Sequence, residues 1–260
     1  MTNQRAPILV YHHVYPEDSP DLREATFETG AGIIGETEFR RQLRYIVDNG
    51  WNFASTTQVV DWLAGDAALP AKAVVLHFDN GWLDTFSVVL PILREFGATA
   101  TCFPITDGVE AAAAARSVTV RTLTEGVVEK PFMNWDQTRA LRDAGWEIGA
   151  HTATHCKIAD QHQEQGDDGV LREAETANAL FAKHLGAAPT HFAYPSGSRN
   201  VRSDELLGRY YRSLRLWHFD WPIHWTFTQR STSLLAVDCQ NIDLRVPFAD
   251  FQRLFDEAAQ

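Results

Sequence analysis

The chain has 260 residues, of which 45% are hydrophobic and 22% are charged, a composition that is typical of globular proteins and excludes a disordered or low-complexity chain. Its 34 acidic side chains outnumber its 23 basic ones, and the resulting formal net charge of −11 argues against nucleic acid as a partner. The sequence has no apolar run near the roughly 20 residues of a membrane-spanning helix, so we expect no membrane partner.

The first residues, up to Val14, contain no basic segment followed by a long apolar stretch. Secretory signals have that pattern, so we expect a cytoplasmic protein. The three cysteines, Cys102, Cys156 and Cys239, are odd in number, far apart and without CxxC spacing. We therefore expect free thiols, with neither a disulfide framework nor a cysteine-based zinc site. The oligomeric state is not encoded in any of these patterns.

Apolar segments of strand length alternate with segments of helical period along the chain. We predict strands at residues 8–14, 51–54, 73–78, 99–105, 146–150, 191–194, 211–217 and 234–238. We predict helices at residues 36–48, 56–63, 85–96, 135–144, 169–185 and 247–258. Pro91 is expected to kink the third of these helices. Ser55 or Thr56 can cap the second helix, and Asn134 is expected to cap the fourth.

This repeated alternation predicts an α/β fold with a parallel sheet and right-handed crossovers. Because no linker rich in Pro, Gly or Ser divides the chain, we expect one domain over residues 1–260, closed in the manner of a barrel. The irregular stretch at residues 107–133 is interpreted as an insertion over the carboxyl ends of the strands.

Polar residues follow several of the predicted strands directly. Asp79 and Asn80 follow the third strand, His151 follows the fifth, and His12 lies at the end of the first. Functional sites of parallel α/β folds lie at the carboxyl ends of strands, so we expect these side chains to share one site. His151 and His155 have the i, i+4 spacing that places two imidazoles on one face of a helical turn, close enough to bind one metal ion.

Four motifs, VYHHV (10–14), FDNG (78–81), HTATH (151–155) and FAYPSG (192–197), lie at ends of predicted strands. In this order they resemble the motifs of the polysaccharide deacetylases (carbohydrate esterase family 4, the NodB-homology domain). FAYPSG is similar to the FAYPYG form of exopolysaccharide-type members, and the resemblance extends from about Ile8 to about Trp221.

The resemblance implies a distorted (β/α) barrel of the polysaccharide deacetylase type, with about seven parallel strands. It also implies an enzyme, a carbon–nitrogen hydrolase that removes an N-acyl group, acetyl in the family, from an amino sugar or glycan. Its members use zinc or another divalent metal, which polarises the acyl oxygen and lowers the pKa of a water molecule.

The resemblance carries specific roles onto this sequence. Asp79 matches the catalytic base, and the backbone N–H of Ser196 matches a donor to the oxyanion. His151 and His155 match two metal ligands, while Asn80 stands where the family has a third ligand, an aspartate. Many members orient the base with an arginine in the third motif. This sequence has alanine at that position, so we expect no counterpart.

The general acid and the sugar contacts are less clearly marked. The family's late Leu-x-x-His segment has no clear match, so His218, His224 and His12 are the candidates for the acid, and His218 is taken as the catalytic one. The residues expected to contact substrate are His12, Tyr194, Trp135 and Trp221. Trp217 and Trp225 are two further aromatic residues that could present a flat face to a sugar ring.

Asn80 leaves three functions open. An amide oxygen is a neutral and weaker metal ligand than a carboxylate, and the sequence does not reveal whether this asparagine is natural or introduced. The first function is a metal-dependent N-deacetylase of an N-acylated amino sugar. The second is a metal-independent C–N hydrolase on the same scaffold, and the third is a catalytically silent glycan-binding domain.

Overall fold

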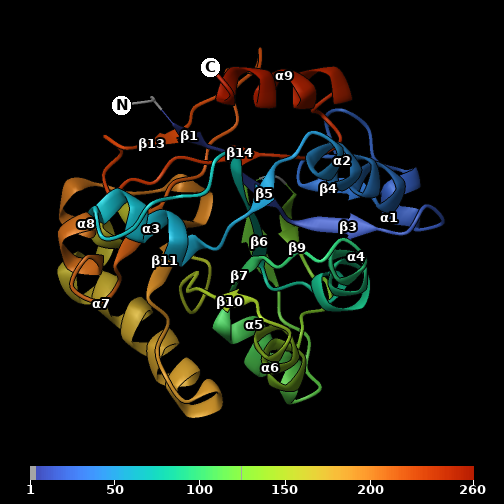
Figure 1. Cartoon of the computed structure of the whole chain (residues 1–260). Helices are drawn as coiled ribbons and strands as arrows, with labels where there is room; N and C mark the ends of the chain where they lie inside the picture. Colours follow the sequence, from blue (N-terminus) through green and yellow to red (C-terminus); the bar gives the residue numbers. More distant parts are fainter. Residues whose placement is uncertain (1–3, 124) are drawn as a thin grey trace.

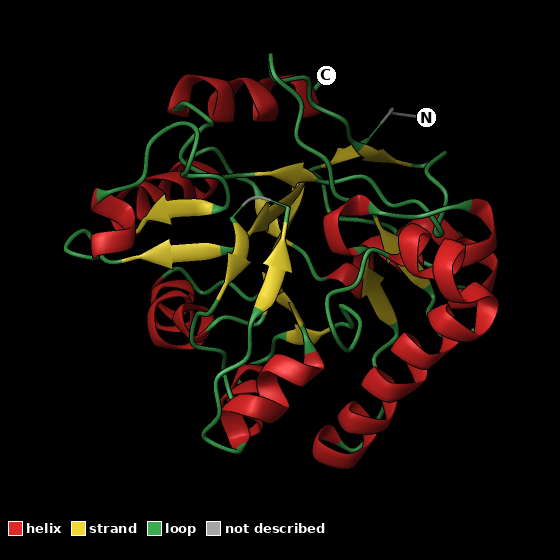
Figure 2. Ribbon diagram, turned by 180° about the vertical axis from the view of Figure 1, so that it is seen from behind, coloured by secondary structure: helices red, strands yellow, loops and turns green. Residues whose placement is uncertain are grey.

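Seven short parallel strands form the centre of the computed structural model, which describes residues 4–123 and 125–260. They are β2 (Ile8–Tyr11), β6 (Ala73–Asn80), β7 (Thr101–Pro104), β10 (Glu147–Ile148), β11 (His191–Ala193), β12 (Ser213–Arg215) and β14 (Gln240–Asn241). Hydrogen bonding joins five of them in the order β10-β7-β6-β2-β14, and β11 pairs with β12. Figure 2 shows these strands at the centre of the molecule with helices around them.

Two isolated parallel bridges close this set into a ring. Ala150 bridges to Phe192 between β10 and β11, and Arg215 bridges to Val237 between β12 and the segment that enters β14. The expected barrel of parallel strands is therefore confirmed. It is distorted because single bridges, not continuous ladders, make these two joints.

Smaller pairs of strands surround the barrel. β5 (Asn52–Phe53) pairs with β6, β3 (His13–Tyr15) pairs with β4 (Ile33–Gly35), and β1 (Arg5–Ala6) pairs with β13 (Thr228–Gln229). The antiparallel hairpin of β8 (Val120–Thr122) and β9 (Gly126–Val128) lies within the segment interpreted as an insertion. No strand was predicted in that hairpin, because its two strands have three residues each.

The larger helices are α2 (Glu36–Asp48), α3 (Thr56–Ala64), α5 (Thr106–Ala113), α6 (Trp135–Asp143), α7 (Ile158–Leu185) and α9 (Phe248–Ala258). The shorter ones are α1 (Pro20–Arg23), α4 (Leu90–Glu95) and α8 (Val201–Leu207). Ser55 and Asn134 cap α3 and α6 through reciprocal capping boxes, as their side chains predict. In the part of the chain that the structure describes, no helix combines the length and the apolar character that crossing a membrane requires.

Two helix predictions differ from the structure. Residues Thr85–Val89 form one π-helical turn that continues directly into α4, and Pro91 is the second residue of α4, just after this turn. α7 begins at Ile158 and not at Gly169, with a break at Gly166 (φ 64°). The first part of α7 was missed because its sequence is polar and carries no apolar stripe.

The apolar core has two main parts. α2 and α9 cover the barrel through Phe39, Leu43, Phe251 and Phe255, which pack with strand residues such as Phe78. α7 and α8 cover β11 and β12 through a second cluster that includes Phe181 and Phe192. α9 lies across one end of the molecule (Figure 1). Both clusters leave the carboxyl ends of the strands free to carry polar side chains.

Candidate active site

The polar residues that follow the strands meet in one cavity at the carboxyl end of the barrel. The cavity is lined by His12, Asp79, Asn80, Thr122, Leu123, His151, His155, Ser196 and Trp217. Asp79 and Asn80 end β6, His151 follows β10, and His12 follows β2. His12 and Trp217, which both line the cavity, are 205 positions apart in the sequence. The side chains predicted to share one site therefore line the same cavity.

Asp79 forms a buried ion pair with Arg215. Arg215 Nη2 lies 2.5 and 2.6 Å from the two carboxylate oxygens, and both side chains are 2% exposed. Burial by itself raises the pKa of Asp79, but the charge and hydrogen bonds of Arg215, together with the neighbouring histidines, outweigh burial and hold the pKa below its usual range. Asp79 is therefore a carboxylate with a fixed orientation at every ordinary pH.

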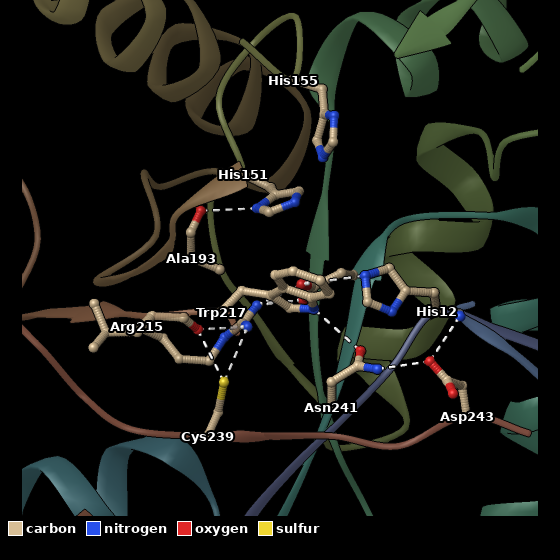
Figure 3. Close-up of polar contacts among 12 residues, drawn as sticks. His12, His151, His155, Ala193, Arg215, Trp217, Cys239, Asn241 and Asp243 are labelled. Atoms are coloured by element: carbon tan, nitrogen blue, oxygen red, sulfur yellow. Dashed lines mark hydrogen bonds and ion pairs between the residues drawn. The ribbon is translucent and has the colours of Figure 1, made fainter. Parts of the chain in front are cut away.

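Arg215 corrects the expectation that no arginine orients Asp79. That expectation rested on Ala193, but Ala193 on β11 pairs in register with Arg215 on β12, so the neighbouring strand supplies the guanidinium. Arg215 also donates to the carbonyl of Leu216 at 2.9 Å and lies 3.7 Å from Cys239 Sγ (Figure 3). A charged residue inside the apolar strand segment SLRL was the signal in the sequence that could have revealed it.

His151 and His155 face one another, with ring centroids 5.0 Å apart (Figure 3). The expectation that a helical turn brings them together is wrong, because residues 151–155 form a loop. Thr152 (φ 65°) and His155 (φ 64°) both have left-handed backbone, which bends the loop back on itself. Glu173 of α7 stabilises this bend by accepting hydrogen bonds from the N–H groups of Ala153 and Thr154, each at 3.0 Å.

The hydrogen bonds of the two imidazoles define which ring nitrogen is available to a ligand. His151 Nδ1 lies 2.8 Å from the carbonyl of Ala193, and His155 Nδ1 lies 2.8 Å from the carbonyl of Arg121. A carbonyl only accepts, so each Nδ1 carries the proton. Burial lowers the pKa of His151 to about 3 and that of His155 to about 4, so both rings are neutral near pH 7. The lone pair is then on Nε2, as in metal-binding histidines whose other nitrogen donates to a carbonyl.

Asn80 occupies the third position of this donor set. It is 1% exposed, and its Oδ1 is a buried acceptor without a hydrogen-bond partner among the described residues. Its backbone is left-handed (φ 71°), and it is followed by Gly81 (φ 80°), where a Cβ would lie 2.6 Å from Cβ of Pro104. The strand therefore ends in a tight turn that needs glycine at position 81.

Two imidazole Nε2 atoms and an unsatisfied amide oxygen fit a divalent cation. The described residues, 4–123 and 125–260, contain no cluster of three or more His, Cys, Asp or Glu side chains that could hold a metal ion. That absence agrees with the sequence, because the third member of the set at this cavity is Asn80, an amide.

The FAYPSG segment brings its backbone to the cavity through two left-handed residues, Ser196 (φ 55°) and Gly197 (φ 65°). A Cβ on Gly197 would overlap the carbonyl oxygen of Trp217. Glycine is therefore required where this loop crosses the strand segment after β12. Ser196 lines the cavity beside the two histidines, where the resemblance places its N–H as a donor.

His12 and Trp217 form the side of the cavity next to Asp79. His12 Nε2 lies 4.0 Å from Asp79 Oδ2, and its Nδ1 is buried without a hydrogen-bond partner in the described part of the chain. Burial lowers the pKa of His12, more than the Asp79 carboxylate raises it. Trp217 Nε1 donates to Asn241 Oδ1 at 3.1 Å, and Asn241 donates to Asp243 at 2.7 Å, which holds the indole beside His12 (Figure 3).

Four predicted site residues do not lie in this cavity. His218 Nε2 shares a hydrogen bond of 3.0 Å with Thr226 Oγ1. His218 and His224 line a separate small cavity. Tyr194 is fully buried in the second core cluster, and its hydroxyl donates to Asp204 at 2.7 Å. His218 and Tyr194 therefore lie outside the cavity in which they were predicted. Position in the chain does not reveal towards which side of a strand end a side chain points.

The two tryptophans predicted to contact sugar also lie elsewhere. Trp135 is 3% exposed, stacks on His184 and donates to Glu110 at 2.7 Å, so it is a core residue. Trp221 is 59% exposed and packs edge-on against Phe27, outside the set that lines the cavity. Trp217 is the tryptophan that borders Asp79 and the histidines.

Comparisons with known proteins agree with this geometry. The family model described as polysaccharide deacetylase matches residues 66–211. Poly-beta-1,6-N-acetyl-D-glucosamine N-deacetylase of Escherichia coli (strain K12) is 29% identical over 146 residues, which are 56% of this chain and 20% of that protein. The Bacillus subtilis (strain 168) protein YxkH, named as a candidate polysaccharide deacetylase, is 22% identical over 75% of this chain and 58% of its own length. The chain thus spans less than two thirds of these curated relatives.

Solved structures show the same fold. The Streptococcus pyogenes deacetylase PplD in complex with acetate has a TM-score of 0.79 at 22% identity, covering 98% of this chain and 99% of that one. IcaB from Ammonifex degensii has a TM-score of 0.71 at 20% identity, covering 99% and 98% of the two chains. Together with the family match and the motifs gathered in the cavity, these findings show that the chain belongs to the polysaccharide deacetylase family.

Proposed function

We propose that this protein hydrolyses the N-acyl group, acetyl by family, of an amino sugar within a glycan, with the help of a divalent cation, zinc by preference. One observation carries the proposal. A carboxylate fixed by Arg215, two neutral imidazoles with free Nε2 atoms and the unsatisfied oxygen of Asn80 face the same cavity. This is the set of groups that amide hydrolysis with an activated water requires.

Asp79 is a weak base, so the reaction needs a cation that makes water easier to deprotonate. Arg215 holds the pKa of Asp79 below its usual range, so Asp79 does not remove a proton from ordinary water at a useful rate. His151, His155 and Asn80 would hold the cation. When bound, the cation supplies a lowered pKa for the attacking water and polarises the acyl oxygen. Asp79 then accepts the water's proton while Arg215 keeps the carboxylate in place.

The proton must return to the nitrogen that leaves. The water oxygen forms a bond to the acyl carbon, the C–N bond breaks, and the amine takes up one proton. Among the three histidines considered for this step, His12 is the one that lines the cavity, 4.0 Å from Asp79. Since burial lowers the pKa of His12, it is neutral in the resting protein and can carry the proton from Asp79 to the amine. The N–H of Ser196 would donate to the oxyanion formed on the acyl carbon.

The surroundings of the cavity suit a sugar. A larger open cavity of about 600 Å³ adjoins it and shares Thr122, Leu123, His155 and Ser196 with it. Its lining is mostly polar, and Trp217 offers an aromatic face beside His12. The Escherichia coli relative is named for action on poly-beta-1,6-N-acetyl-D-glucosamine, and the Streptococcus pyogenes structure contains acetate. Oligomers of N-acetylglucosamine are therefore the first substrates to test.

The test is release of acetate and free amine from N-acetylglucosamine oligomers by purified protein, before and after dialysis against a chelator and after addition of Zn²⁺. We expect activity that chelation removes and Zn²⁺ restores. His12→Gln should lower kcat by about 10²-fold or more, whereas His218→Gln should lower it less than about twofold, because His218 faces another cavity.

The outcomes separate the three functions considered. Activity that survives chelation supports the metal-independent C–N hydrolase. No turnover with any acylated sugar, even for the Asn80→Asp protein supplied with metal, supports the silent glycan-binding domain. A loss with His218→Gln as large as that with His12→Gln contradicts the assignment of His12.

A further inference from the structure

The β8–β9 hairpin forms one wall of the candidate active site. Thr122 and Leu123 at its turn line the cavity. The carbonyl of Arg121 on β8 accepts the hydrogen bond from His155 Nδ1 at 2.8 Å. The position of the hairpin therefore determines in which direction His155 presents its Nε2.

A buried carboxylate joins this hairpin to the body of the barrel. The side chain of Glu125, just before β9, is 9% exposed, and its Oε2 lies 3.4 Å from His13 Nε2. Its other oxygen pairs with Lys130 Nζ. The backbone N–H of Glu125 donates to Thr122 Oγ1 at 3.0 Å, which makes the carboxylate and the turn one unit. His13 Nε2 makes no hydrogen bond to the described residues, so its contact with Glu125 is an ion pair.

His13 is surrounded as a cation would be. It is 1% exposed, and its Nδ1 lies 3.0 Å from Asp84 Oδ1, so both ring nitrogens face carboxylates. Its ring is stacked between Tyr15, at a centroid distance of 4.9 Å, and Trp82, at 5.0 Å. Burial lowers the pKa of His13, but Asp84 and Glu125 together outweigh burial and raise it. Asp84 is itself held by the N–H of Val14 at 2.9 Å.

We propose that His13 is a positioning residue of this site: as an imidazolium between Asp84 and Glu125, it anchors the β8–β9 hairpin and thereby holds the carbonyl that orients His155. The two adjacent histidines of the VYHHV motif then have different tasks. His12 faces the cavity, and His13 faces the carboxylates behind the hairpin. The proposal rests on the proposed function only for the role of His155 as a metal ligand. The contacts of His13 with Asp84 and Glu125 are present without metal or substrate.

The variant that tests this anchor is Glu125→Gln, which keeps the size of the side chain and removes its charge. Glu110→Gln is the control. Glu110 also faces a lysine and a histidine, with Lys183 at 3.6 Å and His184 at 3.3 Å, but its side chain is 37% exposed and does not line the cavity. General destabilisation of the fold by Glu125→Gln would not act selectively on the hairpin and on His155.

Three measurements apply to both variants and the wild type. The first is hydrogen exchange of the amides of residues 120–123 and 125–128, without metal or substrate. The second is the NMR signal of the His155 Nδ1 proton. The third is Zn²⁺ affinity, measured by competition with a chelating dye. For Glu125→Gln we expect faster exchange of the hairpin, a broadened or lost His155 signal and an affinity reduced by about tenfold or more. For Glu110→Gln we expect no change in any of the three.

Wild-type protein provides a measurement that does not depend on the folding of a variant. Nitrogen-15 NMR of the imidazoles at about pH 7 should show protons on both ring nitrogens of His13 and on only one of His155. A neutral His13 overturns the proposal, as do unchanged hairpin exchange and an unchanged His155 signal in folded Glu125→Gln. If the hairpin loosens as expected while wild-type protein neither binds Zn²⁺ nor deacetylates a sugar, the proposed function fails and the anchor stands.

Discussion

Replacement of Arg215 by methionine tests the most buried ionic contact of the site. Methionine keeps much of the length of the side chain and removes the guanidinium. Arg215 Nη2 is 2.5 and 2.6 Å from the Asp79 oxygens, and both side chains are 2% exposed, so water cannot replace the lost partner. Removing one member of a buried ion pair costs about 3–5 kcal/mol. We expect a loss of this size in the free energy of unfolding near pH 7.

The pH dependence of this loss has a defined sign. The folded-state pKa of Asp79 is lowered in the wild type, so the carboxylate contributes stability that is present above its unfolded pKa of about 3.9 and lost as the pH falls through the folded value. Without Arg215, burial dominates and raises the pKa of Asp79 above the unfolded value. The variant then gains stability by protonating Asp79 as the pH falls. The deficit of Arg215→Met is therefore largest near neutral pH and smaller in acid.

Urea unfolding at about pH 7.5 and about pH 5, with a chelator present, measures both effects. Asp79→Asn in the wild-type and Arg215→Met backgrounds completes a double-mutant cycle and should restore most of the stability that Arg215→Met loses. A deficit below about 1 kcal/mol, or one that neither acid nor Asp79→Asn reduces, would refute the reasoning.

Three further substitutions test other parts of the site. Asn80→Asp supplies a charged oxygen beside the two histidines and should raise Zn²⁺ affinity by at least about tenfold in isothermal titration; no increase would argue against Asn80 as a ligand. Glu173→Gln weakens the hydrogen bonds to Ala153 and Thr154 that hold the histidine loop, so Zn²⁺ affinity should fall by about tenfold, and an unchanged affinity would show that the loop is held otherwise. Trp135→Phe removes the hydrogen bond to Glu110 and should lower the free energy of unfolding by about 1 kcal/mol, measured by thermal unfolding, while KM stays unchanged. A large rise in KM would instead support Trp135 as a sugar contact.

Much of the architecture was predictable because it depends on short-range patterns. The apolar stripe of residues 36–48 predicted α2 with its observed bounds, and the capping side chains of Ser55 and Asn134 predicted where α3 and α6 begin. Prediction failed where the local pattern is weak. The polar first part of α7 contacts residues further along the chain, Ser198 and Arg202, and the strands of the β8–β9 hairpin are only three residues long.

The sequence by itself determined the family, the parallel barrel and the meeting of Asp79, Asn80, His151 and His155, because motifs at strand ends must converge wherever parallel strands share an edge. Only the tertiary structure decided that Arg215 replaces the arginine missing at Ala193, that His12 and not His218 faces Asp79, and that Trp217 and not Trp135 borders the cavity. These outcomes depend on strand register and on the side from which a loop enters the site. Register and side are fixed by packing between segments far apart in the chain, which no local pattern of residues encodes.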